Sequence, residues 1–296
     1  MSNLDVFRFV TTHPMNRGAA LKAVVRFAKW QIGSRLVGGD IIHEWVNGSK
    51  FLVRTGETGL TGNIYAGLHE FSDMGFLLHV LRAQDMFIDV GANVGSYSIL
   101  AGKAVGARGY AFEPVPATYG RLVDNIRLNH LENTIRCVNA GLGRASATIK
   151  FTNDLDTVNH AIADGEYHTN TISVAITTMD DVLCEVHPSL IKIDVEGYET
   201  QVLQGAAETL KKGNLHSVIL ELNGSGKRYG YRESDILSMM SAHGFKTYSY
   251  DPFSRILTDL DGKTLRAGNT LFIRDKALVM ERVASAPAIR LLDKQF

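Results

Sequence analysis

The hydrophobic positions of the chain follow two alternating patterns from residue 86 onward. Short apolar runs that suit buried strands are separated by longer stretches with helix-like spacing. The buried strands are predicted at residues 86–90, 109–113, 135–140, 190–195 and 217–222. This alternation favours an α/β fold with a mostly parallel sheet and helices on both of its faces.

The segments between and after these strands complete the predicted sheet. Helices are expected at residues 95–104, 116–130, 198–212 and 233–242. Alternating polar and apolar positions predict half-exposed strands at residues 147–152 and 172–177, with a polar loop between them. Residues 246–250 and 270–274 read as the last two strands, and they suit a hairpin that closes one edge of the sheet.

The first 36 residues combine an apolar stripe with positive charge. Five apolar side chains recur at helical spacing, namely Leu21, Val24, Val25, Ala28 and Ile32. The basic residues of this region are Arg8, Arg17, Lys22, Arg26, Lys29 and Arg35, against Asp5 as its one acid. Such a helix either packs its stripe on a neighbouring core, which is the reading we favour, or lies on an anionic membrane surface.

Residues 38–69 predict a small β segment ahead of the alternating region. Two strand-like runs, 41–46 and 51–54, flank Asn47-Gly48, which is a hairpin signal. A glycine-rich stretch at 56–67 then leads to a helix expected at 70–82. We therefore divide the chain into an N-terminal extension of helix and β segment (1–69), a main domain (70–275) and a C-terminal tail without motifs (276–296).

Composition excludes several classes of protein. The 296 residues are 45% hydrophobic, which is enough for a sizeable core. Lys and Arg total 31, as do Asp and Glu, so the chain lacks the overall basic charge typical of nucleic-acid binding. Cys137 and Cys184 lie in apolar runs without metal-ligand spacing, which indicates a reducing, cytoplasmic setting. No apolar run reaches membrane-spanning length, and the N-terminus lacks a signal-peptide pattern.

The stretch Met86–Gly95, M-F-I-D-V-G-A-N-V-G, carries the strongest functional signal. A buried strand runs into a glycine-punctuated turn, and a helix-like segment begins at Ser96. Such a turn lets the backbone approach a ligand at a helix N-terminus. Glu113 ends the next predicted strand about 20 residues on, where a carboxylate can accept hydrogen bonds from ribose hydroxyls.

Two ligands suit this geometry, and the residues favour one of them. A dinucleotide site has the pattern G-x-G-x-x-G, because a pyrophosphate needs bare backbone amides. Here Asn93 replaces the second glycine, Ser96 replaces the third, and Asp89 would repel a pyrophosphate. S-adenosylmethionine carries a sulfonium and an ammonium group, which suit a carboxylate at this place. The remaining alternative is a βα turn that binds no ligand.

Six motifs, taken in their order along the chain, resemble one known family. They are D-V-G-A-N-V-G-S-Y-S at 89–98, F-E-P at 112–114, L-x-x-N at 122–125, T-T-M-D-D-V-L at 177–183, I-K-I-D-V-E-G-Y-E at 191–199 and V-L-Q-G-A at 202–206. Over roughly residues 70–275 the chain resembles the FkbM family of S-adenosylmethionine-dependent methyltransferases. The resemblance implies a Rossmann-like, doubly wound, seven-stranded sheet with a terminal antiparallel hairpin, and O-methyl transfer to a hydroxyl. It leaves the acceptor open, since relatives act on sugars, polyketides and related small molecules.

Methyl transfer to a hydroxyl requires a donor cradle and a proton acceptor. The cradle candidates are Asp89, Gly91, Ala92, Asn93, Gly95 and Ser96, with Glu113 for the ribose, Asn139 for the adenine and Glu70 for the charged end of the donor. Asp194 ends an otherwise apolar strand and is the favoured base, with a helix-capping role as its alternative. Glu196, Glu221 and His160 are the further catalytic candidates.

Two polar loops are expected above the same edge of the sheet. Their candidates for acceptor binding are Asp154, Asp156, Asn159, Asn223, Arg228 and Tyr229. These side chains supply the hydrogen bonds that polyol recognition needs, although both loops also suit simple exposure to solvent. Asp194 and Glu196 would suit Mg²⁺, but no third ligand is spaced to join them, so the sequence predicts no metal site.

These observations predict an enzyme, a metal-independent O-methyltransferase with S-adenosylmethionine as its cofactor. The expected partner is a sugar or another polyol-like small molecule, with no nucleic acid and no membrane span, and with weak surface association of the basic N-terminus left open. One alternative is a nicotinamide-dependent oxidoreductase, for which we find neither the third glycine nor a Tyr-x-x-x-Lys pair after the middle strands. The other is a non-catalytic donor-binding protein, against which Asp194, Glu196 and Glu221 argue.

Overall fold

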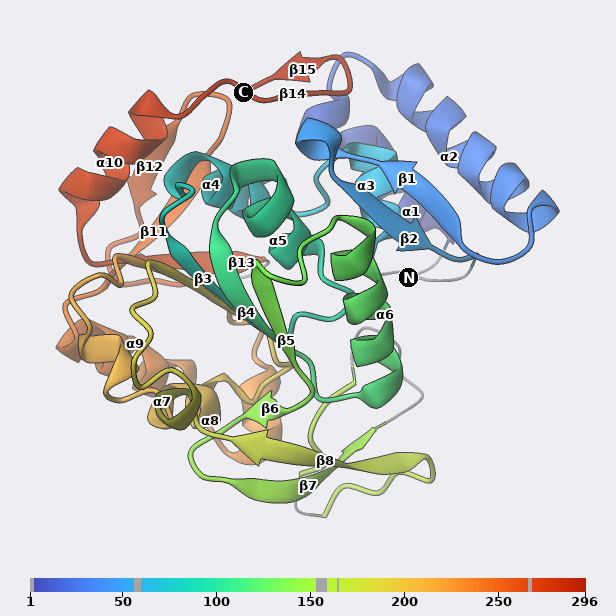
Figure 1. The fold of residues 1–296 in the computed structure, drawn as a ribbon. Coiled ribbons are helices and arrows are strands. Elements are labelled where there is room, and N and C mark those ends of the chain that lie inside the picture. The colour runs from blue at the N-terminus through green and yellow to red at the C-terminus, as the bar shows by residue number, and fades with distance from the viewer. Residues whose placement is uncertain (1–2, 56–59, 153–158, 164, 266–267) are drawn as a thin grey trace.

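The computed structural model describes residues 3–55, 60–152, 159–163, 165–265 and 268–296. Its largest element is an eight-stranded sheet with the order β12-β11-β13-β10-β9-β3-β4-β5 (Figure 1). The strands are β3 (Met86–Val90), β4 (Arg108–Phe112), β5 (Ile135–Val138), β9 (Leu190–Ile193), β10 (Ser217–Glu221), β11 (Lys246–Asp251), β12 (Ile256–Asp259) and β13 (Asn269–Ile273). Strands β10, β9, β3, β4 and β5 run parallel, and β13 runs antiparallel to both β10 and β11.

The predicted mostly parallel sheet with an antiparallel end is confirmed, but its strand number differs. The sequence predicted seven strands, and the structure adds β12, which pairs with β11 at the edge. Only Leu257 of this strand is buried, while Ile256 is exposed. A strand with one buried side chain leaves almost no hydrophobic pattern in the sequence, which is why it was missed.

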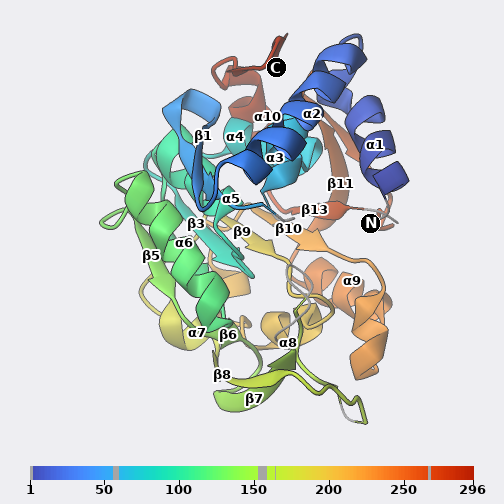
Figure 2. The same ribbon diagram turned by 90° about the vertical axis from the view of Figure 1, so that its right-hand side faces the viewer.

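Helices cover both faces of the sheet, as the alternation of elements predicted. On one face lie α4 (Phe71–Val80), α5 (Ser96–Ile99), α6 (Pro116–Leu128) and α10 (Lys276–Ser285), and on the other lie α7 (Met179–Val182), α8 (Glu199–Gln204) and α9 (Glu233–Ala242) (Figure 2). Successive side chains of one strand enter different cores. Phe87 of β3 packs with α4 and α5, whereas its neighbour Ile88 packs with α7, α8 and α9.

Two predicted helices are shorter or less regular than expected. The helix predicted at 95–104 consists of the single turn α5 followed by a π-helical turn, Leu100–Val105. The helix predicted at 198–212 ends at Gln204 and resumes only as a short 3₁₀ turn, Thr209–Lys211. Gly205 lies so close to the loop at Gly143 that a Cβ there would be 1.9 Å from the Gly143 carbonyl oxygen. This backbone contact ends α8.

A small second sheet lies beside the carboxyl end of the main one. It has the order β6-β8-β7, formed by β6 (Gly141–Leu142), β7 (Ala147–Thr152) and β8 (Thr171–Thr177). The two half-exposed strands predicted at 147–152 and 172–177 are thereby confirmed as the antiparallel pair β7 and β8. Their inner side chains, Phe151, Val174 and Ile176, pack with Val115 in a separate apolar cluster.

The N-terminal region contains α1 (Asn3–Thr12), α2 (Ala20–Leu36), β1 (Ile41–Glu44), β2 (Lys50–Val53) and a helix not predicted, α3 (Thr61–Ala66). The predicted hairpin is confirmed, with Asn47 in the left-handed region at a φ of 50°. Side chains of α6 and of the residue that caps its C-terminus, Asn129, hold it in place. Asn125 accepts from the amide of Leu52, and Asn129 accepts from the amide of Lys50. The hairpin therefore lies against α6.

Helix α2 is oriented differently from the favoured prediction. It buries Ala23 and Trp30 against the rest of the molecule. Three members of the predicted core-facing stripe, Leu21, Val25 and Ile32, are exposed instead. The bulky Trp30 on the opposite side of the helix takes the inward position. The expectation that the stripe packs on the core was wrong for these residues.

The C-terminal residues fold onto the same face as α4. Helix α10 is followed by a two-stranded hairpin, β14 (Arg290–Leu291) and β15 (Lys294–Gln295). Arg282 forms an ion pair with the buried Asp85, and the buried Phe296 packs against Phe71 with ring centroids 5.2 Å apart. Among the residues that the structure describes, no helix combines the length and apolar character needed to cross a bilayer. The division of the chain at residues 69 and 275 stays a prediction.

Candidate active site

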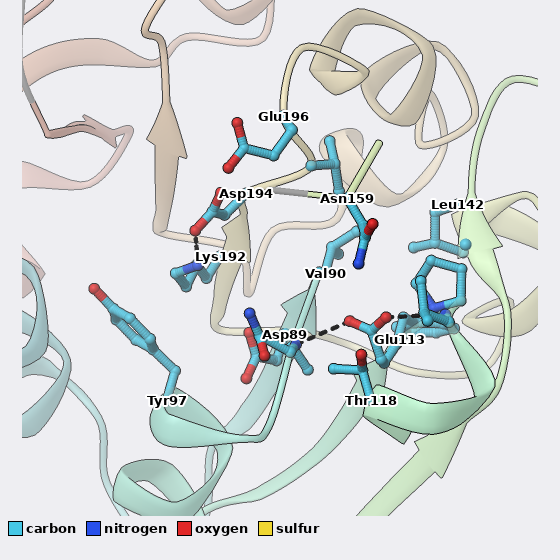
Figure 3. Close-up of a pocket in the computed structure, with 18 of the residues that line it drawn as sticks. Asp89, Val90, Tyr97, Glu113, Thr118, Leu142, Asn159, Lys192, Asp194 and Glu196 are labelled. Atoms are coloured by element: carbon cyan, nitrogen blue, oxygen red, sulfur yellow. Dashed lines mark hydrogen bonds and ion pairs between the residues drawn. The ribbon is translucent and has the colours of Figure 1, made fainter. Parts of the chain in front are cut away.

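A cavity of about 310 Å³ opens at the carboxyl ends of β3, β4, β9 and β10. Between β3 and β9 the order of the strands reverses, and such a switch point is where open α/β sheets bind ligands. Two walls of this cavity carry most of its polar groups (Figure 3). We call the wall formed by the turn after β3 together with Glu113 the β3–β4 wall, and the wall formed by Lys192, Asp194, Glu196 and Glu221 the β9–β10 wall.

The glycine turn of the β3–β4 wall is fixed by its backbone. Gly91 has a φ of 75°, and a Cβ there would lie 1.9 Å from the carbonyl oxygen of Asp194. The amides of Gly91 and Ala92 both donate to the carbonyl of Phe112. Asn93, which replaces the second glycine of the dinucleotide pattern, adopts a φ of 51°, a conformation that Asn tolerates better than most residues. The turn thus brings the ends of β3, β4 and β9 together.

Glu113 stabilises this turn through hydrogen bonds to the backbone. Its two carboxylate oxygens accept from the amides of Asn93 (3.0 Å) and Val115 (2.9 Å). Burial favours the uncharged acid and raises the pKa of Glu113 to about 7, although the two amides partly oppose this shift. Each oxygen retains a further lone pair that can accept a hydrogen bond from a hydroxyl group of a ligand in the cavity.

Asp89 is the deepest carboxyl group of the cavity. The hydroxyl of Ser98 donates to its Oδ2 (2.7 Å), while burial raises the pKa of Asp89. Its other oxygen, Oδ1, is buried and has no hydrogen-bond partner within the described part of the chain. A buried acceptor without a partner is costly unless a ligand supplies the missing donor. An ammonium group would do so, and the residues of this wall therefore fit S-adenosylmethionine.

The β9–β10 wall contains a buried charge pair and a shared proton. Lys192 is almost fully buried, and its ammonium donates to Asp194 Oδ2 at 2.8 Å. Burial raises the pKa of Glu221 to about 9, helped by the neighbouring charge of Asp194 and a hydrogen bond to it. Burial alone would also raise the pKa of Asp194, but Lys192 and Glu221 together hold it below its usual range. At neutral pH, Asp194 is therefore ionised and Glu221 carries the proton.

Glu196 lines the cavity close to Asp194. It is a non-glycine residue with a φ of 53°, a left-handed conformation that costs energy and often marks functional positions. Burial raises the pKa of Glu196, as does the charge of Asp194. Its backbone carbonyl accepts from Arg228 (3.3 Å). The strained turn points a carboxylate of raised basicity into the cavity (Figure 3).

A third polar group lies where α4 meets the cavity. Glu70 accepts from the hydroxyl of Tyr97 (2.8 Å) and from the side-chain amide of Asn269 (3.0 Å). The same amide donates to the buried Asp73 at 3.1 Å, and burial raises the pKa of Asp73 to about 8. The Lys192 ammonium lies 4.7 Å from the centroid of the Tyr97 ring. These contacts join α4, α5, β9 and β13 under one side of the cavity.

Two clusters in the described residues have metal-ligand spacing. In each of them the candidate ligand atoms lie within 4.8 Å of one another, and the clusters are Asp194, Glu196 and Glu221, and His160, Glu166 and His168. The expectation that no third ligand would join Asp194 and Glu196 was therefore wrong. Parallel pairing of β9 with β10 brings Glu221 to their side, which sequence spacing does not reveal.

His160 belongs to a hydrogen-bonded group just outside the cavity lining. His160 and His168 each place Nε2 3.0 Å from Glu166 Oε1, and Arg228 lies 3.9 Å from the same oxygen. Burial favours the neutral acid, but the bonds from Ala163 and the two imidazoles outweigh it and lower the pKa of Glu166 to about 2. His160 thus lies beside the cavity rather than in its wall.

The predicted site residues fall into three groups. Those that line the cavity are Glu70, Asp89, Gly91, Ala92, Asn93, Ser96, Glu113, Asn159, Asp194, Glu196 and Glu221. Those that the structure places outside its lining are Gly95, Asn139, His160, Asn223, Arg228 and Tyr229. The side chain of Asn139 donates to the carbonyls of Glu113 and Pro114, and Tyr229 donates to the carbonyl of Ala161. Asp154 and Asp156 lie outside the described residues.

Sequence reasoning missed several polar residues that line the cavity, namely His69, Tyr97, Thr118, Lys192 and Tyr198. Two of them matter most for the site, because the sequence pattern assigns Lys192 to an apolar strand and Tyr97 to a helix without a functional role. Both line the cavity and are buried. The available signal was the charge of Lys192 itself, since a lysine inside a central strand needs a buried partner.

The strand order and the cavity at its switch point define a Rossmann-like fold with a cavity where such sheets bind ligands. The family comparison is more specific. The model of the FkbM methyltransferase domain matches residues 89–247, so the chain belongs to the FkbM methyltransferase family. The matched segment includes the glycine turn, Glu113 and the whole β9–β10 wall.

The individual proteins compared with the chain are 31% identical to it or less. A hexuronic acid methyltransferase, AglP, of Haloferax volcanii is 30% identical over 171 residues, which cover 56% of this chain and 65% of that protein. Methyltransferase 1 of Beauveria bassiana is 31% identical over 146 residues, which cover 41% and 58%. The chain thus spans less than two thirds of the length of these relatives. A crystal structure of an FkbM methyltransferase from Methylobacillus flagellatus is 17% identical with a TM-score of 0.43, covering 65% of this chain and 44% of that one.

Proposed function

We propose that this protein transfers a methyl group from S-adenosylmethionine to a hydroxyl of a sugar or another polyol-like small molecule. One observation carries the proposal. One wall of the cavity contains the glycine turn and Asp89, whose buried Oδ1 has no hydrogen-bond partner among the residues that the structure describes. The facing wall presents the ionised Asp194. A donor site and a proton acceptor therefore face the same space.

The β3–β4 wall would hold the donor. Asp89 Oδ1 suits the donor's ammonium, Glu113 suits its ribose hydroxyls, and the turn at Gly91 lets the ligand approach the backbone. Glu70, fixed by Tyr97 and Asn269, also lines the cavity and, like Asp89, interacts with the charge of Lys192. When bound, the donor supplies an electrophilic methyl group on a sulfonium, whose sulfur keeps the electron pair and leaves as a neutral thioether.

The β9–β10 wall would hold the acceptor and take its proton. The acceptor oxygen must lose its proton as it forms the new bond to carbon, and a carboxylate nearby can receive it. Asp194 is the proposed base, because it is ionised, faces the cavity and is held in place by Lys192. Glu196 is the rival base, because its pKa is raised and it also lines the cavity. Neither group has to protonate the leaving group, because the thioether leaves as a neutral molecule.

The acceptor class rests on two supports. The relative from Haloferax volcanii is named for a hexuronic acid, and the cavity lining offers Asn159 and Glu196 to hydroxyl groups. Arg228 lies outside the cavity lining and donates to the carbonyl of Glu196. Polyols are recognised by several hydrogen-bonding side chains placed around a concave site. A sugar acceptor fits these features.

Calorimetry and a transfer assay test the proposal together. We expect S-adenosylmethionine to bind and NAD to show no binding, whereas NAD binding without donor binding would point to an oxidoreductase. Radiolabelled donor is then incubated with sugars and with hexuronic acids, and the product is treated with mild base. A label that survives base marks a methyl ether on a hydroxyl, as expected. A label released by base would mark a methyl ester on a carboxylate, and donor binding without transfer would favour a non-catalytic donor-binding protein.

A further inference from the structure

Helix α2 carries apolar side chains on two opposite faces. Its inner face buries Ala23, Trp30 and Ser34. Its outer face presents Leu21, Val25, Ile32 and Leu36, whose exposed fractions are 79%, 44%, 63% and 79%. At about 100° per residue these four side chains fall in one row along the helix, roughly opposite Trp30. Both ribbon views place α2 at the outer edge of the molecule (Figures 1 and 2).

This row is not required for folding of the helix onto the protein. The inner face already supplies the packing, with Trp30 and Ala23 in the main core cluster. Single exposed apolar side chains are ordinary on protein surfaces, but a continuous row along one helix marks a surface that binds something apolar. The row continues past the helix end in Val37, which is 57% exposed.

Positive charge borders the row on both sides. The helical spacing places Lys22 and Lys29 along one flank and Arg35 along the other. All three are exposed, and α2 contains no acidic residue. Lys22 pairs with Asp293 at 2.7 Å, an exposed pair that lends little stability. Arg26 is instead turned inward, where it donates to Asn16 and to the carbonyl of Tyr65.

An exposed apolar row can bind either a second copy of the chain or a lipid surface, and the charges beside the row decide between these two. In a symmetric dimer through α2, the same basic flanks would face each other, and the helix offers no acid to pair with them. An anionic lipid surface supplies both an apolar interior for the row and negative charge for the flanks. We infer that α2 docks this protein onto anionic membrane surfaces, with the Leu21–Leu36 row inserted at the interface.

The docked geometry follows from the helix itself. Seventeen residues extend over about 25 Å, and the charged flanks keep the axis parallel to the bilayer plane. One such helix gives weak and reversible binding, because it inserts few side chains and depends partly on screened charges.

Vesicle co-sedimentation of the full chain tests this inference. The probes are phosphatidylcholine vesicles with and without phosphatidylglycerol, at low and at high salt. We expect binding to the anionic vesicles that weakens as salt rises, and much weaker binding to the neutral ones. The double variant Leu21→Gln/Ile32→Gln should lower the partition constant roughly tenfold or more, because it removes apolar area without touching the inner face. The double variant Lys29→Gln/Arg35→Gln should lower binding to anionic vesicles only.

A matched control separates the row from surface hydrophobicity in general. Ile256→Gln/Met280→Gln removes two exposed apolar side chains from β12 and α10, far from α2, and should leave the partition constant unchanged. Circular dichroism checks that each variant is folded. Equal binding by the Leu21→Gln/Ile32→Gln variant, or no preference for anionic vesicles, would overturn the inference. So would a dimer in light scattering that this variant dissociates, since α2 would then bind a second copy.

Discussion

Asp89 and Glu113 on one wall of the cavity contrast with Asp194 on the other, although Glu196 and Glu221 beside Asp194 also have raised pKa values. On the β3–β4 wall, Asp89 and Glu113 are hydrogen-bonded by neutral groups, a serine hydroxyl and two backbone amides, and the pKa of each is raised. On the β9–β10 wall, Asp194 lies against the Lys192 ammonium and its pKa is lowered. All three carboxyl groups line the same cavity, so the difference between their pKa values comes from the groups next to each of them.

This contrast separates two tasks that one cavity must combine. A wall whose carboxyl groups are hydrogen-bonded by neutral groups suits a ligand that brings its own positive charge. A wall whose carboxylate is already paired with a lysine stays ionised when the cavity is filled, and it can take a proton from a neutral acceptor. The predictions below test this contrast, beginning with the largest expected effect.

Removing the proton acceptor should have the largest effect. Asp194→Asn keeps the shape of the side chain but removes its charge, so we expect kcat to fall by about 10²–10⁴-fold. Donor affinity should change much less, because the donor is proposed to bind at the other wall. Steady-state kinetics and calorimetry measure the two quantities separately.

His160→Gln is the matched control for this experiment. His160 lies outside the cavity lining and bonds Glu166, so its replacement should leave most of the turnover intact. If His160→Gln abolished turnover while Asp194→Asn retained it, the base would be His160. Retained turnover in Asp194→Asn together with loss in Glu196→Gln would move the role to Glu196.

The second largest effect should appear on the other wall. Glu113→Ala removes the acceptor proposed for the ribose hydroxyls and leaves two backbone amides without their partner. Binding of S-adenosylmethionine should weaken by about 1–3 kcal/mol, which is the usual cost of unpaired buried polar groups. Asn139→Ala is the control, since its side chain bonds two carbonyls behind the cavity. A larger loss of donor affinity in Asn139→Ala than in Glu113→Ala would reverse these assignments.

Pairing of neighbouring strands explains which parts of the site were predictable. The alternating pattern located β3, β4, β9 and β10, and carboxylates at their ends had to meet at one edge of the sheet. The register pairs Ile193 with Leu220, so the next residues, Asp194 and Glu221, lie side by side. Their shared proton follows from this register, which the sequence alone does not give.

The unpredicted features depend on contacts between distant segments. Lys192 points into the cavity only because Asp194, Tyr97 and Asp89 surround its ammonium. The orientation of α2 depends on where Trp30 finds its core, and helical periodicity does not indicate which of two apolar faces turns inward. Short elements such as α3 and β12 leave too few residues for a periodic pattern.

The shared proton predicts a smaller effect on stability. The pKa of Glu221 is raised from 4.5 to about 9 on folding, so the native state binds more protons than the unfolded state between these values. Stability should therefore fall as pH rises through this window. Glu221→Gln can donate to Asp194 at every pH, and its melting temperature should fall less between pH 5 and pH 9 than that of the wild type. Parallel pH profiles of the two proteins would show that Asp194 and Glu221 do not share a proton.

Removal of metal ions by chelation should have the smallest effect, because we expect turnover to stay unchanged. Asp194, Glu196 and Glu221 have the spacing of a metal site, but Lys192 already neutralises Asp194 and the proton on Glu221 removes a second charge. A divalent cation would have to displace the ammonium from 2.8 Å and release that proton, which weakens the site for Mg²⁺. Turnover measured after EDTA treatment should equal that of the untreated protein. If EDTA abolished activity and Mg²⁺ restored it, these carboxylates would be metal ligands. The β9–β10 wall would then resemble the other wall, because both would bind a positive charge that the protein itself does not supply.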